Sequence, residues 1–127
     1  MAIVALGLDL AQVTRIADVL ERRGARFAER IFTAGERAYC ERRLRAANSY
    51  AGRFAVKEAV MKALGTGWAQ GVRWIDIEVV RPPGEAPTVQ LHGAALAIAH
   101  ARGITRWHIT ITHDAGLAAA VAVAESA

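Results

Sequence analysis

The segment from Phe54 to Gly67 constrains this chain most, because it places one glutamate and both of the chain's lysines in an otherwise apolar helix. At about 100° per residue, one stripe of the helix carries that glutamate among apolar side chains, and a second stripe is wholly apolar. The first stripe consists of Ala47, Ala51, Phe54, Glu58 and Met61, and the second of Val56, Val60 and Leu64. A helix that is apolar on nearly every side is buried, so we predict that this segment is the central helix of the fold.

Glu58 is the first candidate for a functional residue. A carboxylate in a buried helix must take up a proton, meet a cation or bind a metal, because an unpaired buried charge is strongly unfavourable. Alternatively, Glu58 and Lys62, one helical turn apart, form an ordinary helix ion pair that contributes about 0.3–0.5 kcal/mol. The sequence alone leaves both interpretations open.

Asp9 is the second candidate, since it is the only acidic residue in the apolar run from Ile3 to Leu10, which predicts a buried strand over residues 2–9. Alternation places it on the strand face of Ala5 and Gly7, where small side chains leave room for a ligand. Alternatively, Asp9 caps the next helix, because Gln12 follows three residues later, as in a capping box. The two roles are compatible, since a capping carboxylate keeps a free oxygen.

A metal ion follows if the fold brings Asp9 and Glu58 together, because two close carboxylates stay ionised only with a cation between them. Magnesium meets this demand, since it prefers oxygen ligands and usually takes one or two carboxylates together with phosphates and water. The four histidines and Cys40 lack the spacing of a zinc site. The sequence therefore favours magnesium over zinc.

The end of the central helix, at Gly65-Thr66-Gly67, predicts a glycine C-cap. Because the negative end of a helix repels phosphate, we assign phosphate binding to Lys62 and Arg53. The glycines also let a ligand approach the backbone closely. His113 stands at the end of a predicted strand, where it is either structural or in contact with the ligand.

The charge of the chain indicates an anionic partner. Fourteen arginines and two lysines against twelve acidic residues give a net charge of +4, and many of the arginines lie between residues 22 and 45. The cluster is a solvated helix face, a docking surface for an acidic protein or a nucleic-acid patch. Nucleic acid ranks last, because the cluster has no interleaved aromatic residues and no nucleic-acid-binding signature.

Length and apolar runs predict a single soluble domain over residues 1–127, small enough for a neighbouring subunit to complete an active site. The longest apolar run, Ile3 to Leu8, is too short to span a bilayer, and no positively charged segment precedes it as in a secretion signal. The single Cys40 cannot form a disulfide within the chain. We expect a cytoplasmic protein that does not bind a membrane.

The pattern of elements predicts an α+β fold, an antiparallel sheet packed around the long central helix. Glycine, proline and polar residues separate the predicted elements, and Asp114-Ala115-Gly116 joins the last two strands as a hairpin turn. The predicted strands are residues 2–9, 74–80, 88–91, 107–113 and 117–124, and the predicted helices are residues 11–23, ended by Gly24, about 34–43, about 46–64 and 93–101.

Three segments carry a family resemblance when taken in order: Gly7–Leu10 followed by Arg15-Ile16, then Arg53–Gly67, then Ile109–Asp114. The central segment is the most specific, because it combines the glutamate, both lysines and the terminal glycines. Together, and almost from end to end, they resemble the holo-acyl-carrier-protein synthases, the small 4′-phosphopantetheinyl transferases. One departure is that Thr110 and Thr112 stand where serine is common in that family, which retains the hydroxyls and adds methyl groups.

The resemblance implies the 4′-phosphopantetheinyl transferase fold and a transferase of fatty acid and lipid metabolism. Such an enzyme moves the phosphopantetheine group of coenzyme A to a serine of apo acyl carrier protein and releases adenosine 3′,5′-bisphosphate. The resemblance also implies a homotrimer with its active sites between subunits. It assigns the following residues: Mg²⁺ ligands Asp9 and Glu58; catalytic residues Asp9, Glu58 and Lys62; coenzyme A contacts Arg53, Lys62, Gly65, Gly67 and His113; carrier-protein docking residues Arg15, Arg22, Arg23 and Arg26.

Two alternatives from other functional classes remain open at this point. A coenzyme A or nucleotide binding module would bind the ligand without turnover. A small basic nucleic-acid-binding protein would lose affinity steeply as the salt concentration rises.

Overall fold

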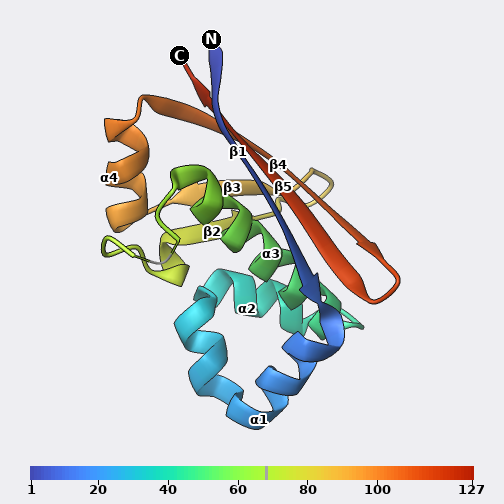
Figure 1. Cartoon of the computed structure of the whole chain (residues 1–127). Coiled ribbons are helices and arrows are strands. Elements are labelled where there is room, and N and C mark those ends of the chain that lie inside the picture. The colour runs from blue at the N-terminus through green and yellow to red at the C-terminus, as the bar shows by residue number, and fades with distance from the viewer. Residues whose placement is uncertain (68) are drawn as a thin grey trace.

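Two antiparallel sheets and the helices around them form the structure, a computed structural model that describes residues 1–67 and 69–127. The main sheet has the strand order β1 (Ala2–Gln12), β5 (Leu117–Ser126), β4 (Ile104–Asp114), and β2 (Ile77–Val80) pairs with β3 (Thr88–Leu91). In Figure 1 the three long strands form one twisted sheet, and the two chain ends lie together at the upper end of this sheet. The predicted α+β class is confirmed.

The central helix α3 (Ala46–Leu64) lies between the main sheet and the β2–β3 hairpin (Figure 1). Most of its side chains are buried against β1 and β5 on one side and against β2 on another, as the apolar pattern predicts. Gly65 ends the helix in the left-handed conformation, with φ of 78°, and its N–H donates to the carbonyl of Met61. The predicted central helix and its glycine cap are confirmed.

Gly7 allows α3 to approach β1 closely. A Cβ atom added at Gly7 would lie 1.8 Å from the carbonyl oxygen of Ala59, which is far inside the contact distance. Because that oxygen belongs to the backbone of a buried helix, it cannot move aside without displacing the helix. The small residue at position 7 therefore sets the distance between the strand that carries Asp9 and the helix that carries Glu58.

We expect Gly7→Ala to lower the free energy of unfolding by about 3 kcal/mol or more, because overpacking a close helix–strand contact forces the backbone apart. Urea denaturation of the variant and of the original protein measures this difference. Gly35→Ala is the matched control, since its added Cβ would be 3.4 Å from the nearest atom, the Glu78 carboxylate. Equal stability of Gly7→Ala and Gly35→Ala would contradict the close approach.

The helix predicted to end before Gly24 continues beyond it, so that prediction is wrong in part. Helix α1 (Val13–Ile31) is kinked at Gly24, where φ is 57° and ψ is −139°, a conformation that only glycine adopts readily. Gly24 thus breaks the helix, as the sequence indicates, but the chain resumes a helix directly afterwards. Helix α2 (Ala34–Glu41) follows and begins with a capping box between Thr33 and Glu36.

Several strand boundaries also differ from the prediction. Strand β1 continues three residues past Asp9, because its ladder with β5 extends to the pair Gln12–Leu117. At the start of the predicted strand over 74–80, residues Trp74–Asp76 form a 3₁₀ turn, since the Asp76 carboxylate accepts a hydrogen bond from the Arg73 N–H. Strand β4 starts earlier than predicted and ends at the expected hairpin turn, where Ala115 and Gly116 both have positive φ.

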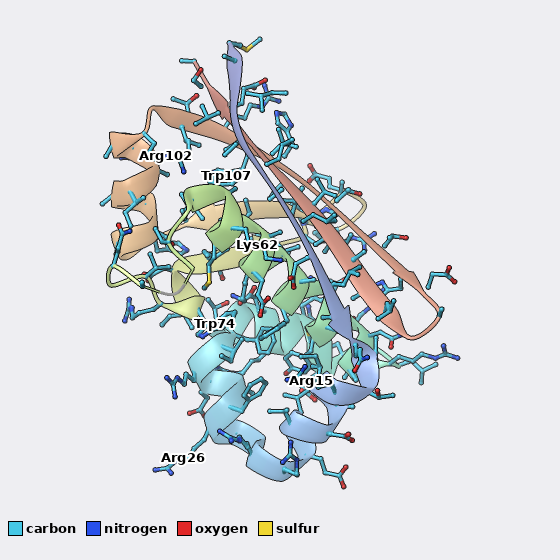
Figure 2. All side chains as sticks on the ribbon, viewed as in Figure 1. Arg15, Arg26, Lys62, Trp74, Arg102 and Trp107 are labelled. Atoms are coloured by element: carbon cyan, nitrogen blue, oxygen red, sulfur yellow. The ribbon has the colours of Figure 1, made fainter. Side chains whose placement is uncertain are left out.

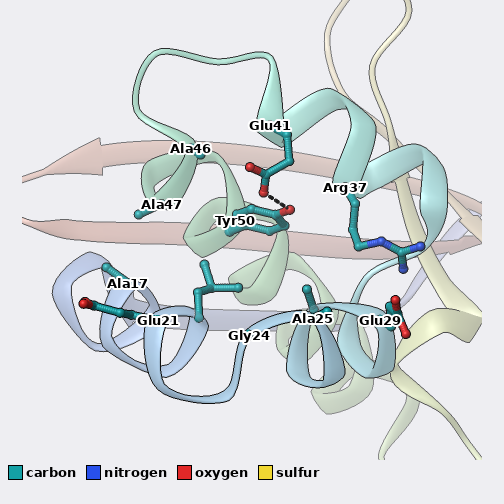
Figure 3. Close-up of a pocket in the computed structure, with 12 residues that line it drawn as sticks. Ala17, Glu21, Gly24, Ala25, Glu29, Arg37, Glu41, Ala46, Ala47 and Tyr50 are labelled. Carbon is teal, nitrogen blue, oxygen red and sulfur yellow. Dashed lines mark hydrogen bonds between the residues drawn. The ribbon is translucent and has the colours of Figure 1, made fainter.

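The two halves of α1 curve around a hollow of about 580 Å³ that α2 and the start of α3 close from the other side (Figure 3). Alanines line much of it, and the Tyr50 hydroxyl donates to the Glu41 carboxylate at 2.5 Å. Burial and this hydrogen bond raise the pKa of Tyr50. None of the residues predicted for the functional site lines this hollow.

A buried ion pair joins α2, α3 and the segment from Trp74 to Val79. The Lys57 ammonium lies 2.7 Å from the Glu36 carboxylate, and both side chains are fully buried. Lys57 also donates to the carbonyls of Trp74 and Ile77, while Glu36 accepts from the N–H groups of Thr33 and Val79. Burial lowers the pKa of Lys57, although the charge of Glu36 acts against that shift. Lys57 therefore has a structural role, for which the sequence provided no partner.

Helix α4 (Gly93–Ala101) covers one end of the main sheet (Figure 1). Among the described residues, none of the helices combines the length and hydropathy that crossing a bilayer requires.

Candidate functional site

Asp9, Glu58 and Lys62 come together where β1 crosses α3. Asp9 is 8% exposed, and its Oδ1 lies 2.8 Å from the Lys62 Nζ, which also donates to the carbonyl of Leu8. The hydrogen bond to Asp9 raises the pKa of Lys62. Lys62 is more than half exposed, so its ammonium is accessible from solvent. Figure 2 shows Lys62 in the middle of the molecule, between α3 and β1.

This geometry contradicts two of the alternatives considered for the carboxylates. Lys62 pairs with Asp9 across the helix–strand contact instead of with Glu58 along the helix. Asp9 does not cap a helix, because it lies inside β1, and the N-cap residue of α1 is Gln12, which makes no capping hydrogen bond with its side chain. Both corrections arise from tertiary contacts that local spacing does not contain.

Glu58 and Asp9 are close enough to share a hydrogen bond. Burial, the negative charge of Asp9 and this hydrogen bond raise the pKa of Glu58 to about 7, although Lys62 and Arg15 act in the opposite direction. In the absence of another cation, Glu58 is therefore partly protonated near neutral pH. A divalent cation would displace that proton.

The donor set fits a magnesium ion. The Asp9 Oδ2 atom is buried and has no hydrogen-bond partner, which leaves one carboxylate oxygen of the pair free for a ligand. The described residues contain no group of three or more acidic, histidine or cysteine side chains around one point. Two carboxylates with the remaining positions left for phosphate and water are typical of magnesium and unlike a zinc centre.

The glycines after α3 leave space near Lys62. Apart from its chain neighbours, a Cβ atom added at Gly65 or at Gly67 would have no atom of the described residues within 4 Å, and both residues have positive φ. Thr66 N–H and Gly65 N–H both donate to the carbonyl of Met61, so the cap satisfies the end of the helix. The backbone beside Lys62 is therefore open to a ligand.

Arg53 and His113 meet in a second place, a pocket of about 390 Å³ beside β4 and the loop between β2 and β3. Arg53 is only 5% exposed, and its Nε has no hydrogen-bond partner. The His113 Nε2 lies 2.8 Å from the carbonyl of Asn48, so this nitrogen is the one that donates. Arg43 and Arg81 also line the pocket, and none of the acidic residues in the described part of the chain does.

The two groups of predicted site residues lie on different sides of α3. Arg53 and Glu58 are five residues apart, so their side chains leave the helix about 140° apart. Asp9 lies on β1 and His113 on β4, and these strands are the two edges of the main sheet. The chain thus presents two half-sites, one with paired carboxylates and a lysine, the other with arginines and a histidine.

The predicted docking arginines all lie on α1, but they divide between two hollows. Arg15 lines a pocket of about 570 Å³ together with Glu58 and Phe54. Arg23 and Arg26 line a groove of about 490 Å³ beside Trp74, whose ring stacks on Phe54 at 5.0 Å between ring centroids. Arg22 is exposed on the same helix. Figure 2 shows Arg15 near the end of β1 and Arg26 pointing outward from the second half of α1.

The pocket that contains Arg53 and His113 is called the arginine pocket below. Sequence reasoning missed three residues that line it with Arg53, namely Tyr39, Arg43 and Arg81. The Arg43 guanidinium carbon is 5.2 Å from the centre of the Tyr39 ring. The spacing of four residues between Tyr39 and Arg43 is a signal that was available, since aromatic and basic side chains one turn apart contact each other. The contact between Tyr39 and Arg53 joins two different helices, so no spacing within the sequence indicates it.

The sequence and the fold match one class of protein. Residues 5–122 match the model of the 4′-phosphopantetheinyl transferase superfamily, and the chain belongs to that family.

Among curated relatives, the holo-[acyl-carrier-protein] synthase of Solibacter usitatus is 48% identical over 98% of this chain and 99% of its own length. The enzyme of the same name from Methylobacterium nodulans is 50% identical over 98% of this chain and 97% of its own. The crystal structure of the Neisseria meningitidis synthase superposes with a TM-score of 0.89 at 29% identity, covering 98% of this chain and 100% of that one. The Helicobacter pylori synthase, solved in complex with coenzyme A, superposes with a TM-score of 0.83 at 32% identity, covering 94% and 99%.

Proposed function

We propose that the chain is a single-domain holo-acyl-carrier-protein synthase. It transfers the 4′-phosphopantetheine group of coenzyme A to a serine hydroxyl of apo acyl carrier protein and releases adenosine 3′,5′-bisphosphate. The observation that carries the proposal is the arrangement of Asp9, Glu58 and Lys62 at the crossing of β1 and α3, in a member of this transferase family. The turnover-free binding module is disfavoured, because simple binding does not require two crowded carboxylates beside a lysine.

Asp9 and Glu58 hold the magnesium ion in this proposal. Support comes from the unpartnered Asp9 Oδ2 and from the raised pKa of Glu58, which both indicate a place for a cation. A magnesium ion held there would supply positive charge to balance the charge that builds up on the pyrophosphate of coenzyme A during transfer.

Lys62 acts on the leaving group. Its exposed ammonium, oriented by Asp9, balances the negative charge of the departing adenosine 3′,5′-bisphosphate or protonates it. Gly65 and Gly67 leave the adjacent backbone free for contact with coenzyme A. Arg53 and His113 bind an anionic group of coenzyme A that lies away from Lys62. Glu58 or a water molecule accepts the proton of the serine hydroxyl as that oxygen attacks phosphorus.

A homotrimer with active sites between subunits joins the two half-sites. Each chain carries the carboxylates at one edge of the main sheet and the arginine pocket at the other, so neighbouring copies complete one another's site. The outer face of β1 exposes three leucines, Leu6, Leu8 and Leu10, each by 60% or more. A row of exposed leucines on one strand is typical of a surface that another subunit covers.

Leu6→Asp is expected to convert the trimer into monomers and to abolish transfer, because a charge on that face is incompatible with a buried interface. Light scattering coupled to size exclusion gives the mass, and carrier-protein modification gives the activity. Leu44→Asp is the control, since Leu44 is fully exposed in the loop between α2 and α3. An active monomeric Leu6→Asp variant would disprove the shared site.

The docking surface for the carrier protein is α1, with Arg15, Arg22, Arg23 and Arg26. Support comes from the groove beside Arg23 and Arg26, where cationic side chains border the aromatic ring of Trp74. In this groove, an acidic helical partner would form ion pairs with the arginines and apolar contacts with the tryptophan ring. Its association rate would be high and would fall as the salt concentration rises. The net charge of +4 is consistent with this partner.

Arg23→Glu is expected to raise the KM for carrier protein about tenfold and to leave the KM for coenzyme A unchanged, since the residue lies outside both half-sites. Steady-state kinetics with each substrate varied in turn measure the two constants. Arg106→Glu, the same charge change on exposed β4, controls for net charge. Equal increases in both constants, or in both variants, would contradict the docking role.

Intact-mass spectrometry of an apo acyl carrier protein tests the proposed function. After incubation with the chain, coenzyme A and magnesium, we expect a mass gain of one phosphopantetheine that a chelator prevents. No mass gain with intact coenzyme A binding would favour the binding module, and no gain without binding would overturn the proposal. A steep dependence of nucleic-acid affinity on salt would instead favour the nucleic-acid alternative.

We place the reaction in the cytoplasm, in fatty acid biosynthesis.

A further inference from the structure

The arginine pocket contains a buried cation without a counter-charge. Arg53 is 5% exposed, and none of the ion pairs among the described residues includes it. Its Nε is buried and has no hydrogen-bond partner. An unpaired buried guanidinium is unfavourable, so the pocket is built to receive an anion.

The Arg53 guanidinium lies over the aromatic ring of Tyr39. The Arg53 Cζ lies 4.0 Å from the centre of the Tyr39 ring, and the Arg43 Cζ lies 5.2 Å from the same centre. Tyr39 is on α2 and Arg53 is on α3, so the contact fixes Arg53 relative to a second helix. A guanidinium held over an aromatic face keeps its N–H donors at its edge, free for a bidentate anion.

The anion follows from the chemistry of the substrate. Coenzyme A carries a pyrophosphate, which the proposed function places at Asp9, Glu58 and Lys62, and a phosphate monoester on its ribose. The pocket lies on the other side of α3 from those residues and is lined by three arginines and a histidine. The phosphate monoester is therefore the group that remains for this pocket.

From this arrangement we propose that Tyr39 is a positioning residue, which holds Arg53 and Arg43 for the ribose phosphate and thereby makes the enzyme prefer coenzyme A over 3′-dephospho-coenzyme A. The inference rests on the proposed function for its substrate. It assigns selectivity to a side chain that contacts the arginines without reacting itself.

The test compares Tyr39→Met, which keeps an apolar, unbranched side chain but removes the ring, with Tyr39→Phe, which keeps the aromatic face. We expect Tyr39→Met to raise the KM for coenzyme A about five- to tenfold, the size of a cation–π contact to a half-buried ring, with kcat unchanged. The KM for 3′-dephospho-coenzyme A stays the same, and Tyr39→Phe behaves like the original protein. Equal changes for both substrates, or no change for either, would overturn the proposal.

A binding measurement separates this proposal from the proposed function. Calorimetry with adenosine 3′,5′-bisphosphate and with adenosine 5′-monophosphate reports the ribose phosphate without any transfer. Selective binding of the bisphosphate that Tyr39→Met removes would support the inference even if no transfer occurred, whereas equal binding of both nucleotides to the original protein would overturn it. Thermal melting confirms folding, and Tyr39→Leu replaces Tyr39→Met if the latter does not fold.

Discussion

Replacing Lys57 with methionine is expected to lower the free energy of unfolding by about 3–5 kcal/mol, because it leaves the Glu36 carboxylate buried without its counter-charge. Both side chains are fully buried, and their 2.7 Å ion pair connects α3 with α2. The substitution also removes the donors to the carbonyls of Trp74 and Ile77. A loss of this size is a large part of the stability of a domain of this length.

Urea denaturation of Lys57→Met measures the loss, and Lys62→Met is the matched control. Lys62 is 56% exposed although Asp9 is buried, so water can take the place that Lys62 leaves, and we expect a smaller loss, of about 1 kcal/mol. The two variants should therefore separate stability from activity, since Lys62→Met stays folded and loses transfer. Adding Glu36→Gln to Lys57→Met should restore part of the stability. Equal stability of the two lysine variants would contradict the structural role of Lys57.

Glu58→Gln is expected to lower magnesium-dependent transfer at least about 100-fold while the fold is retained, because the amide cannot supply the negative charge that a divalent cation requires. Carrier-protein modification measures the transfer. A thermal melt with and without magnesium provides a readout apart from activity: magnesium should raise the melting temperature of the original protein and leave that of the variant unchanged. Near-normal turnover of Glu58→Gln would refute the metal role.

Glu58 makes the stability of the original protein depend on pH in the absence of metal, and Glu58→Gln is the reference without this group. The folded protein holds a proton on Glu58 up to a pKa of about 7, against an ordinary value of 4.5. Above pH 4.5 the unfolded chain loses this proton first, so the stabilising contribution of the protonated group is lost as the pH rises through about 7. Between pH 5 and pH 8, the original protein should therefore lose stability relative to Glu58→Gln.

The sequence contained enough local information to predict most of the fold. The apolar pattern of residues 46–64 predicted the central helix, and alternation predicted the strands, with boundary errors where long-range pairing extended them. β1 reaches Gln12 because β5 lies beside it, and no property of residues 10–12 alone indicates that. Gly24 correctly indicated a break in the helix. The direction of the second half of α1 after this break depends on its packing against α2 and α3, which local sequence does not contain.

The amino-acid sequence by itself determined which residue types are present for the chemistry: an acidic residue in a strand, a glutamate and a lysine on one helix, and an excess of arginine. Only the tertiary structure decided their partners, pairing Lys62 with Asp9, Lys57 with Glu36, and Arg53 with Tyr39. It also separated the carboxylates from the arginine pocket by the width of α3. The physical reason is that helix and strand propensities act over a few neighbouring residues, whereas ion pairs, stacking and burial depend on residues that only the packed fold brings together.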